Sequence, residues 1–302
     1  MKIRYIHSAD IDVAKWDSCI SGSVNGIVYA YSWYLDIVAG QWDALVGDNY
    51  DAVFPLVSAQ KYGISYLYQP LFTQQLGLFS TKQLNTNTVN AFLSAIPAKY
   101  RYININLNTF TRASLLGAAV NSRVTYQLDL IEPFRVLSSR YSANTKRNVS
   151  KSVAYGVTVL KGGTVDDFIA FKKEHEAVPI SPANLNKLRM IIAAATGSGQ
   201  GEVYMAYSNR NELCAAAFFI RSNGKVIYLS AASSPQGKGS RAMFGLIDCF
   251  LMQNSESRLV LDFEGSTIPS IARFYAGFGA TPSNYDHVRI NRLPWPLKLM
   301  LP

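Results

Sequence analysis

Two apolar runs of strand length stand out in the second half of the chain, and each is followed by a segment with helical periodicity. The first run covers residues 225–230 and the second covers residues 259–263. Small and glycine residues follow each run, and apolar residues then recur at helical spacing. Two successive strand–turn–helix units place two helix N-termini beside two strand ends. Because free N–H groups and the helix dipole favour an anion there, we expect an anionic ligand in this region.

Short strands separated by turns occur in both halves of the chain at similar spacing. Those of the first half are expected at 44–46, 52–58 and 64–68, and those of the second half at 203–207, 213–220 and 225–229. Asn223-Gly224 between two apolar runs is a strong hairpin signal. The pattern predicts a duplicated antiparallel meander and therefore two similar domains, with a chance coincidence of hairpins as the alternative.

Helices are expected beside these strands. Thr164 begins a capping box, residues 183–196 form an apolar-faced helix that Gly197 can end, and residues 243–252 follow a glycine-rich turn. A further helix is expected at 113–120. Alternating strands and helices predict a mixed α/β (α+β) fold, in which each domain has a mostly antiparallel sheet flanked by helices.

Pro133 interrupts a strand-like run, and this is where we expect one domain to end. The expected domains are therefore 1–133 and 134–302. The most basic stretch follows this boundary and contains no acidic residue; its cations are Arg135, Arg140, Lys146, Arg147 and Lys151. It is interpreted either as a solvated helix flank or as a docking surface for a phosphate-bearing partner.

The charge of the chain is concentrated in its second half. The formal net charge is +9, of which residues 1–130 contribute +1 and residues 131–302 contribute +8. The second half therefore attracts anions such as a nucleotide cofactor, a nucleic acid or a lipid headgroup. Solubility is the alternative reason for the charge. The oligomeric state cannot be inferred from the sequence.

Cysteine usage and hydropathy indicate a cytoplasmic protein without a metal site. Cys19, Cys214 and Cys249 are scattered, and they form neither a CxxC pair nor a cluster with histidine. This usage is typical of a reducing compartment. No apolar run approaches the roughly 20 residues that a membrane span needs, so no span is expected.

The glycine-rich segment 235–242 is the best candidate for an anion site. Its glycines allow the backbone to approach a ligand, and Lys238 and Arg241 add positive charge to the helix N-terminus that follows. The segment lacks the spacing of a Walker loop and the third glycine of a dinucleotide fingerprint.

This segment resembles motif A of the GNAT acetyltransferase superfamily, Gln/Arg-x-x-Gly-x-Gly/Ala. Gln236 and Gly239 match the motif, whereas Arg241 stands where its second small residue belongs. In that family the loop amides hold the pyrophosphate of acetyl-CoA. The resemblance therefore implies an acyl-CoA donor held by the six residues Gln236, Gly237, Lys238, Gly239, Ser240 and Arg241.

A second motif, Phe274-Tyr-Ala-Gly-Phe-Gly279, resembles the GNAT signature Phe/Leu-Tyr-x-x-x-Gly. In many members the tyrosine of this signature protonates the leaving thiolate, which implies that role for Tyr275. The alternative is that Tyr275 is only a core aromatic of an amphipathic helix. The asparagine that GNAT proteins often have near this helix start is replaced by Ile268.

Most of the chain resembles the Fem-type (FemABX-like) branch, which consists of two tandem GNAT domains. The similarity lies in residues 141–159, in Leu261-Asp-Phe-Glu-Gly-Ser266 and in the Phe274–Ala280 segment. In this family the C-terminal tail returns to the first domain, so the tail 291–302 is expected to do so. The first domain is expected to face the acceptor and to have a degenerate donor site.

Fem-type members that use aminoacyl-tRNA often carry lysine where Tyr275 stands, and they tend to be longer. Both departures favour acyl-CoA over aminoacyl-tRNA as the donor. The resemblance therefore implies transfer of an acyl group, in the first place acetyl, from acyl-CoA to an amine. Two alternatives remain: an aminoacyl-tRNA-dependent transferase acting on a peptidoglycan precursor or peptide, and a non-catalytic module that binds an anion or a protein.

Two acidic residues and one polar loop complete the candidate site. Asp262 and Glu264 are two residues apart on an expected strand and would share a face, and Glu264 is the better candidate for a base toward an amine. Structural hydrogen bonding by these acids is the alternative. Gln69, Thr73, Gln74 and Gln75 are difficult to explain as core residues and are candidates for the acceptor site.

Overall fold

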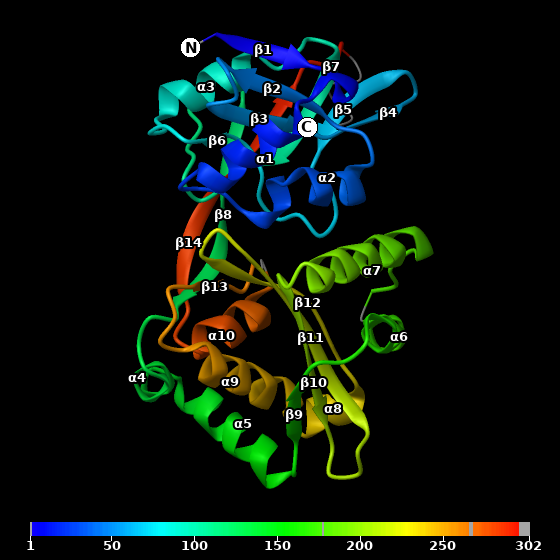
Figure 1. The fold of residues 1–302 in the computed structure, drawn as a ribbon, viewed down its shortest axis with the longest axis vertical. Helices are drawn as coiled ribbons and strands as arrows, with labels where there is room; N and C mark the ends of the chain where they lie inside the picture. The colour runs from blue at the N-terminus through cyan, green and yellow to red at the C-terminus, as the bar shows by residue number, and fades with distance from the viewer. Residues whose placement is uncertain (1, 177, 266–267, 296–302) are drawn as a thin grey trace. The chain divides into compact units, whose positions relative to one another are not determined.

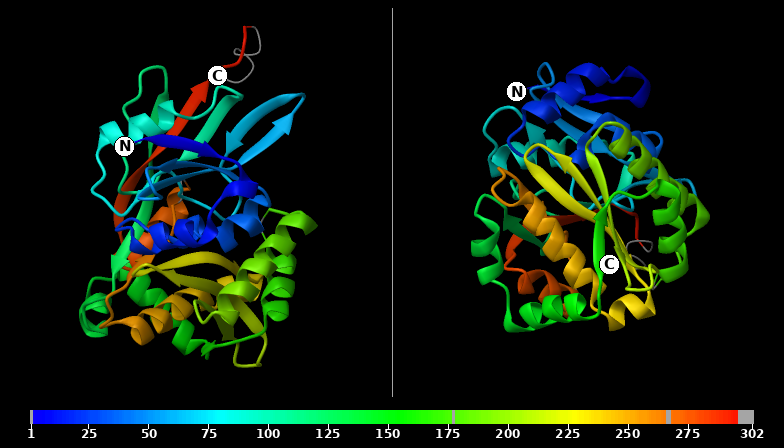
Figure 2. Two further views of the ribbon diagram at one scale, coloured as in Figure 1. Left: turned by 45° about the horizontal axis from the view of Figure 1, so that its top comes forward. Right: turned by 60° about the horizontal axis from the view of Figure 1, so that its bottom comes forward.

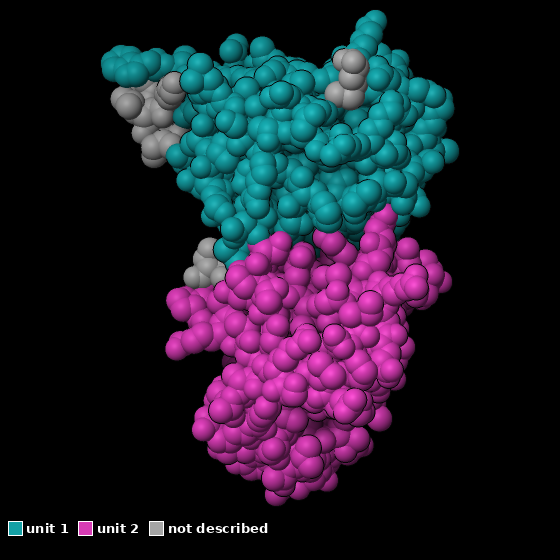
Figure 3. Space-filling model, turned by 90° about the vertical axis from the view of Figure 1, so that its left-hand side faces the viewer, with its two compact units in different colours: residues 1–124, 284–302 teal, residues 125–283 magenta. Residues whose placement is uncertain are grey.

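The computed structural model describes residues 2–176, 178–265 and 268–295. The chain forms two compact units, which Figure 3 colours separately: unit 1 consists of residues 1–124 and 284–302, and unit 2 consists of residues 125–283. The expected domain division at residues 133/134 stays a prediction. The chain enters unit 2 within β8 (Ala119–Asp129) and returns to unit 1 within β14 (Thr281–Asn291).

Unit 1 contains two groups of hydrogen-bonded strands and three α-helices among its described residues. The helices are α1 (Val13–Gly22), α2 (Ser32–Ala39) and α3 (Thr86–Ser94), with short 3-10 helices η1 (Ser8–Asp10) and η2 (Val28–Ala30). The strands are β1 (Ile3–Ile6), β2 (Asp43–Gly47), β3 (Ala52–Leu56), β4 (Ser58–Lys61), β5 (Ile64–Tyr68), β6 (Phe79–Ser80) and β7 (Tyr100–Asn106). The strand orders are β1-β2-β3-β6 and β4-β5-β7-β14.

One hydrophobic core joins both strand groups of unit 1 to α3. Phe54 of β3 and Phe92 of α3 are buried with stacked rings, and Ile103 of β7 and Val288 of β14 belong to the same cluster. β5 and β7 are parallel, whereas the other strand pairs within this unit are antiparallel.

Unit 2 has the strand order β8-β13-β12-β11-β10-β9. Its strands are β9 (Thr158–Lys161), β10 (Gly201–Tyr207), β11 (Leu213–Ser222), β12 (Lys225–Ser233) and β13 (Val260–Asp262). Its helices are α4 (Phe134–Ser139), α5 (Ala143–Ala154), α6 (Val165–His175), α7 (Pro182–Gly197), α8 (Pro235–Gly239), α9 (Ala242–Asn254) and α10 (Pro269–Gly277). Here too one pair, β12 with β13, is parallel among antiparallel neighbours.

Helices cover both faces of the sheet in unit 2, as Figures 1 and 2 show. Phe218 and Phe219 are neighbours on β11 and therefore point to opposite faces. The Phe219 ring stacks on Phe250 of α9 at 3.8 Å between centroids, and the Phe218 ring meets Phe168 of α6 edge-on at 6.5 Å. α9 and α6 thus lie on opposite faces, and burial on both faces explains why β11 is apolar along most of its length.

Most elements expected from the sequence are confirmed, and so is the mixed fold. The hairpin turn at Asn223-Gly224 has φ of 49° and 71°, and Tyr62-Gly63 in unit 1 has the same two positive angles, 53° and 75°. Both angles are typical of the two-residue turn that joins twisted strands. The helix expected at 113–120 is wrong: β8 begins at Ala119, and residues 113–118 before it are irregular apart from a turn at 116–117.

The expected return of the tail can be followed only in part. β14 pairs with β7, and beyond it the Arg292 N–H donates to the Arg101 carbonyl at 2.8 Å. The Arg292 guanidinium donates to the Ile96 carbonyl at 3.1 Å. Residues 296–302 of the expected tail lie outside the described residues. Across the part of the chain that the structure describes, no helix is long and apolar enough to cross a bilayer.

Candidate functional site

The two parallel strands of unit 2 separate after a short contact. β12 and β13 pair only from Lys225 opposite Val260 to Ile227 opposite Asp262, whereas β12 continues to Ser233. Beyond Ile227, no strand among the described residues pairs with this edge of β12. The result is an opening within the sheet, which we call the strand opening, bounded by residues 228–233 of β12 and the end of β13.

A lysine occupies part of this open edge. The Lys172 ammonium of α6 donates to the Ala231 carbonyl of β12 at 2.8 Å and forms an ion pair with Glu176. The Lys172 side chain is only 10% exposed. A buried ammonium normally requires such a carboxylate partner. The sequence did not predict a lysine at the strand opening. Lys172 lies among other charged residues on its helix, and this pattern is typical of a solvent-exposed helix face.

Asp262 is fully engaged in structural hydrogen bonds. Its carboxylate accepts hydrogen bonds from the Thr125 hydroxyl and the Gln127 amide of β8, the latter at 2.9 Å. It also accepts one from the Glu264 backbone N–H at 2.9 Å. Since Asp262 is 1% exposed and bonded through both oxygens, it fixes the end of β13 against β8.

Glu264 lies beyond the strand and not on it. β13 ends at Asp262, and the backbone of Glu264 has a φ of 62°, a left-handed conformation that is uncommon for glutamate. Its carbonyl accepts a hydrogen bond from the Tyr126 N–H at 3.3 Å. Burial raises the pKa of the Glu264 carboxyl to about 8. The group therefore exchanges a proton near neutral pH, which is the range that a general acid or base requires.

Tyr275 of α10 lies beside Glu264 within a cluster of aromatic rings. Its ring stacks on Phe263 at 4.9 Å between centroids and meets Tyr228 edge-on at 6.2 Å. Burial, and then the charges of Glu264 and Asp262, raise the pKa of Tyr275 well above its usual value. The phenol thus stays protonated over the physiological range and can only donate its proton to a strong base.

The glycine-rich segment is a short helix rather than an open loop. Residues 235–239 form α8, capped by the Ser234 hydroxyl, which accepts from the Gly237 N–H at 3.0 Å. The N–H groups of Lys238, Ser240 and Arg241 donate to carbonyls of the same turn. Four of the amides expected to face a pyrophosphate are therefore already bonded in this conformation.

The side chains of this segment have defined partners. Gln236 donates to the Glu212 carboxylate at 2.8 Å, and the Ser240 hydroxyl lies 3.4 Å from the Gly237 carbonyl. The Arg241 guanidinium donates to the Lys238 carbonyl at 3.2 Å, and its backbone φ of 61° forms the corner between α8 and α9. Gly239 has no atom near the position of a Cβ, so it does not require glycine for packing. The assignment of these residues to a donor stays a prediction.

The expected acceptor residues all lie in the loop after β5 in unit 1. The Gln69 side chain donates to the Thr73 carbonyl at 2.7 Å and accepts from the Asn106 N–H at 2.9 Å. The Gln75 side chain accepts from Thr109 at 3.1 Å and donates to Gln74 at 3.0 Å. These hydrogen bonds hold the loop on β7 and on the residues that follow β7. They give the glutamine side chains a structural role. The role of these residues in acceptor binding stays a prediction.

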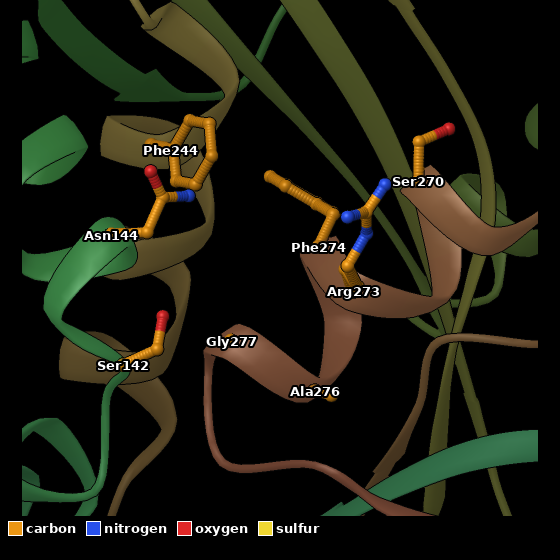
Figure 4. Close-up of a pocket in the computed structure, with 8 residues that line it drawn as sticks. All are labelled: Ser142, Asn144, Phe244, Ser270, Arg273, Phe274, Ala276 and Gly277. Atoms are coloured by element: carbon orange, nitrogen blue, oxygen red, sulfur yellow. The ribbon is translucent and has the colours of Figure 1, made fainter.

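A pocket of about 720 Å³ lies between α5, α9 and α10 in unit 2 (Figure 4). Its lining residues are Ser142, Asn144, Phe244, Ser270, Arg273, Phe274, Ala276 and Gly277. Asn144 and Arg273 lie on opposite sides of it, and the rings of Phe244 and Phe274 are 4.8 Å apart. The lining contains one cation and no carboxylate, so it favours an anionic or neutral ligand. Among the described residues, no cluster of histidine, cysteine and acids could hold a metal.

Comparisons with known proteins show the fold of this chain. No protein-family model matches it, and no curated protein sequence matches it. The crystal structure of FemX is similar over 100% of both chains, with a TM-score of 0.69 and 12% identity. L-PGS from Bacillus licheniformis covers 96% of this chain and 95% of its own, with a TM-score of 0.56 and 9% identity. The C-terminal domain (DUF2156) of a protein named as a lysylphosphatidylglycerol synthetase from Agrobacterium fabrum covers 96% and 94%, with a TM-score of 0.54 and 9% identity.

These values show likeness of fold along nearly the whole chain at low identity. The chain therefore has the Fem-like tandem GNAT fold.

Proposed function

We propose that the protein is an acyltransferase that moves an acyl group from an activated donor to an amine, with its reaction site at the strand opening of unit 2. The proposal rests on one observation above all: a buried carboxyl group with a pKa of about 8, Glu264, lies beside Tyr275 where β12 and β13 separate. The likeness to FemX and L-PGS supports a transferase of this kind.

In the proposed reaction the amine nitrogen attacks the acyl carbonyl carbon. A C–N bond forms, the amine proton passes to the ionised Glu264 carboxylate, and the bond between the acyl carbon and the leaving group breaks. Tyr275 donates its proton to the departing atom.

Acyl-CoA is the first candidate donor, with its phosphates held by the segment Gln236–Arg241 and the acyl group at the strand opening. Calorimetry with acetyl-CoA tests this assignment. Lys238→Ala combined with Arg241→Ala should weaken binding at least about tenfold, whereas Lys173→Ala combined with Arg258→Ala removes the same charge at two exposed positions outside the segment and should not. Absence of binding at millimolar acetyl-CoA would eliminate this donor.

An aminoacyl ester of tRNA is the second candidate donor, and two observations favour it. The amides of α8 are already hydrogen-bonded in their own turn. The raised pKa of Tyr275 also makes it a poor acid toward a thiolate, whereas an alkoxide is a stronger base and can take its proton. tRNA binding measured by fluorescence anisotropy should then fall steeply with salt. Binding that does not change with salt would count against this donor.

The catalytic role of Glu264 is tested with either donor. Turnover with a panel of amines should rise with pH toward about 8, because the base is then ionised. Glu264→Gln should remove this rise and lower kcat by roughly 10²–10⁴, whereas Glu256→Gln should leave both unchanged. Glu256 is a suitable control because it is exposed and also has a positive φ, 59°. Full activity of Glu264→Gln would refute the proposed site.

A further inference from the structure

One face of the sheet in unit 1 carries polar and aromatic side chains in register. Leu67, Ile103 and Ile290 belong to the core, so the residues that alternate with them along β5, β7 and β14 point to the other face. We call this surface the basic–tyrosine face; it is formed by Tyr66, Tyr68, Tyr102, Asn104, His287 and Arg289. All six are partly exposed.

The register brings three tyrosines beside an arginine. Tyr66 lies opposite Tyr102, Tyr68 lies opposite Asn104, and Asn104 lies opposite Arg289 on the next strand. Neighbouring strands are about 4.8 Å apart. The rings of Tyr66 and Tyr68 are 6.0 Å apart. The face therefore combines a patch of rings with a guanidinium group.

Two arginines lie at this face, Arg289 within it and Arg123 on the neighbouring strand β8, and neither has a carboxylate partner among the described residues. Arg289 forms no ion pair with any described residue, and Arg123 of β8 donates instead to the Asn106 amide oxygen at 3.1 Å. On the opposite face of β14, by contrast, the carboxylate of Asp286 forms an ion pair with Arg112 at 3.0 Å. Two guanidinium groups without counter-charge create a local positive potential.

His287 lies within this potential. Its Nε2 atom is within hydrogen-bond distance of the Asn104 side-chain oxygen. Burial, and then the charges of Arg123 and Arg289, lower the pKa of His287 to about 4. The ring is therefore neutral at pH 7, and the oxygen of Asn104 holds its proton on Nε2. The charges of Arg123 and Arg289 therefore both reach the imidazole of His287.

We propose that the basic–tyrosine face binds a phosphorylated ligand that carries a flat ring. Arg123 and Arg289 would bind the phosphate groups through their forked N–H donors, and the tyrosines would contact the ring. Charge complementarity selects an anion, and the paired arginines favour phosphate over a single carboxylate. This site lies in unit 1 and involves none of the residues assigned to acyl transfer.

Calorimetric titration with pyrophosphate and with ADP tests both parts of the site. Both should bind, and ADP should bind more tightly because only ADP carries a ring. Arg289→Gln should weaken both at least roughly tenfold. Arg101→Gln removes the same charge from an exposed position on β7 and should change neither by more than about twofold. Tyr68→Ser should reduce ADP binding to the level of pyrophosphate.

Proton NMR of His287 provides a readout that a structural role of the arginines would not produce. Pyrophosphate should raise the pKa of His287, since it neutralises the two guanidinium charges. The proposal is overturned if neither ligand binds at about 10 mM, or if Arg101→Gln weakens binding as much as Arg289→Gln does. Equal affinities for ADP and pyrophosphate would refute the ring contact. Acyl transfer is not needed for any of these measurements, so the two proposals can fail separately.

Discussion

Asp262 and Glu264 carry the same acidic group two residues apart, yet their surroundings differ. Asp262 receives three hydrogen bonds and fixes a strand end. Glu264 follows in a left-handed conformation that places it off the strand, where burial keeps its carboxyl largely protonated at neutral pH. The sequence favoured Glu264 over Asp262 as a base, but it could not predict the hydrogen bonds of Asp262, because Thr125 and Gln127 lie more than a hundred positions earlier.

The raised pKa of Glu264 predicts a pH-dependent stability. The folded protein keeps the proton up to about pH 8, whereas the unfolded chain releases it near pH 4.5. The free energy of unfolding should therefore fall as pH rises between these values, by at most about 1.4 kcal/mol per pH unit from this group. Urea unfolding at pH 5 and pH 8 measures the fall. Glu264→Gln should reduce it, and the exposed control Glu256→Gln should not; equal falls in all three proteins would contradict the assignment.

At the scale of elements, the sequence was most informative where local chemistry decides the structure. The hairpin at Asn223-Gly224 and the cap at Thr164 occur as expected, because positive φ angles and side-chain capping are local properties. The conformation of the glycine-rich segment 235–242 was more difficult to predict from its sequence. Its glycines indicated a turn whose backbone can approach a ligand, but the Ser234 cap and Pro235 at the first position begin a helix there.

The two glycines of α8 should respond differently to alanine. A Cβ on Gly237 would overlap the Cys214 carbonyl of β11, whereas a Cβ on Gly239 would meet no atom within 4 Å. Gly237→Ala should therefore destabilise the protein by roughly 1–3 kcal/mol, as overpacking usually does. Gly239→Ala should be neutral or stabilising by up to about 1 kcal/mol, since alanine favours helix. Thermal unfolding of both variants tests this, and similar losses for the two would show that α8 does not pack on β11 as described.

At the scale of the molecule, the chain builds unit 1 from both of its ends. The core of unit 1 includes Val288 and Ile290 of β14, which pair with β7. No local pattern near the C-terminus predicts the pairing of β14 with β7, because an apolar strand does not by itself specify which strand it pairs with. The resemblance to Fem-type proteins places the tail 291–302 on the first domain, and this stays a prediction; of its described residues, Arg292 donates to the Ile96 carbonyl.

The position of β14 predicts that a C-terminal substitution should destabilise the core of unit 1. Ile290 is 7% exposed, so Ile290→Ala should lower the free energy of unfolding by roughly 2–5 kcal/mol. Trp295→Ala removes a larger side chain that is 78% exposed and should have little effect. Denaturant unfolding followed by circular dichroism compares the two. If the tryptophan variant proved the less stable one, the described pairing of β14 would be wrong.

The residue pattern alone was sufficient to predict the mixed fold, the repeated hairpins and most helices, because turns, caps and apolar periodicity are encoded by neighbouring residues. The tertiary structure decided how the candidate site residues are used. Burial set the pKa of Glu264, the hydrogen bonds of α8 engaged the expected phosphate-binding amides, and strand register gathered Tyr68, Arg289 and His287 on one face. Such properties depend on desolvation and on partners distant in the chain, which no local pattern contains.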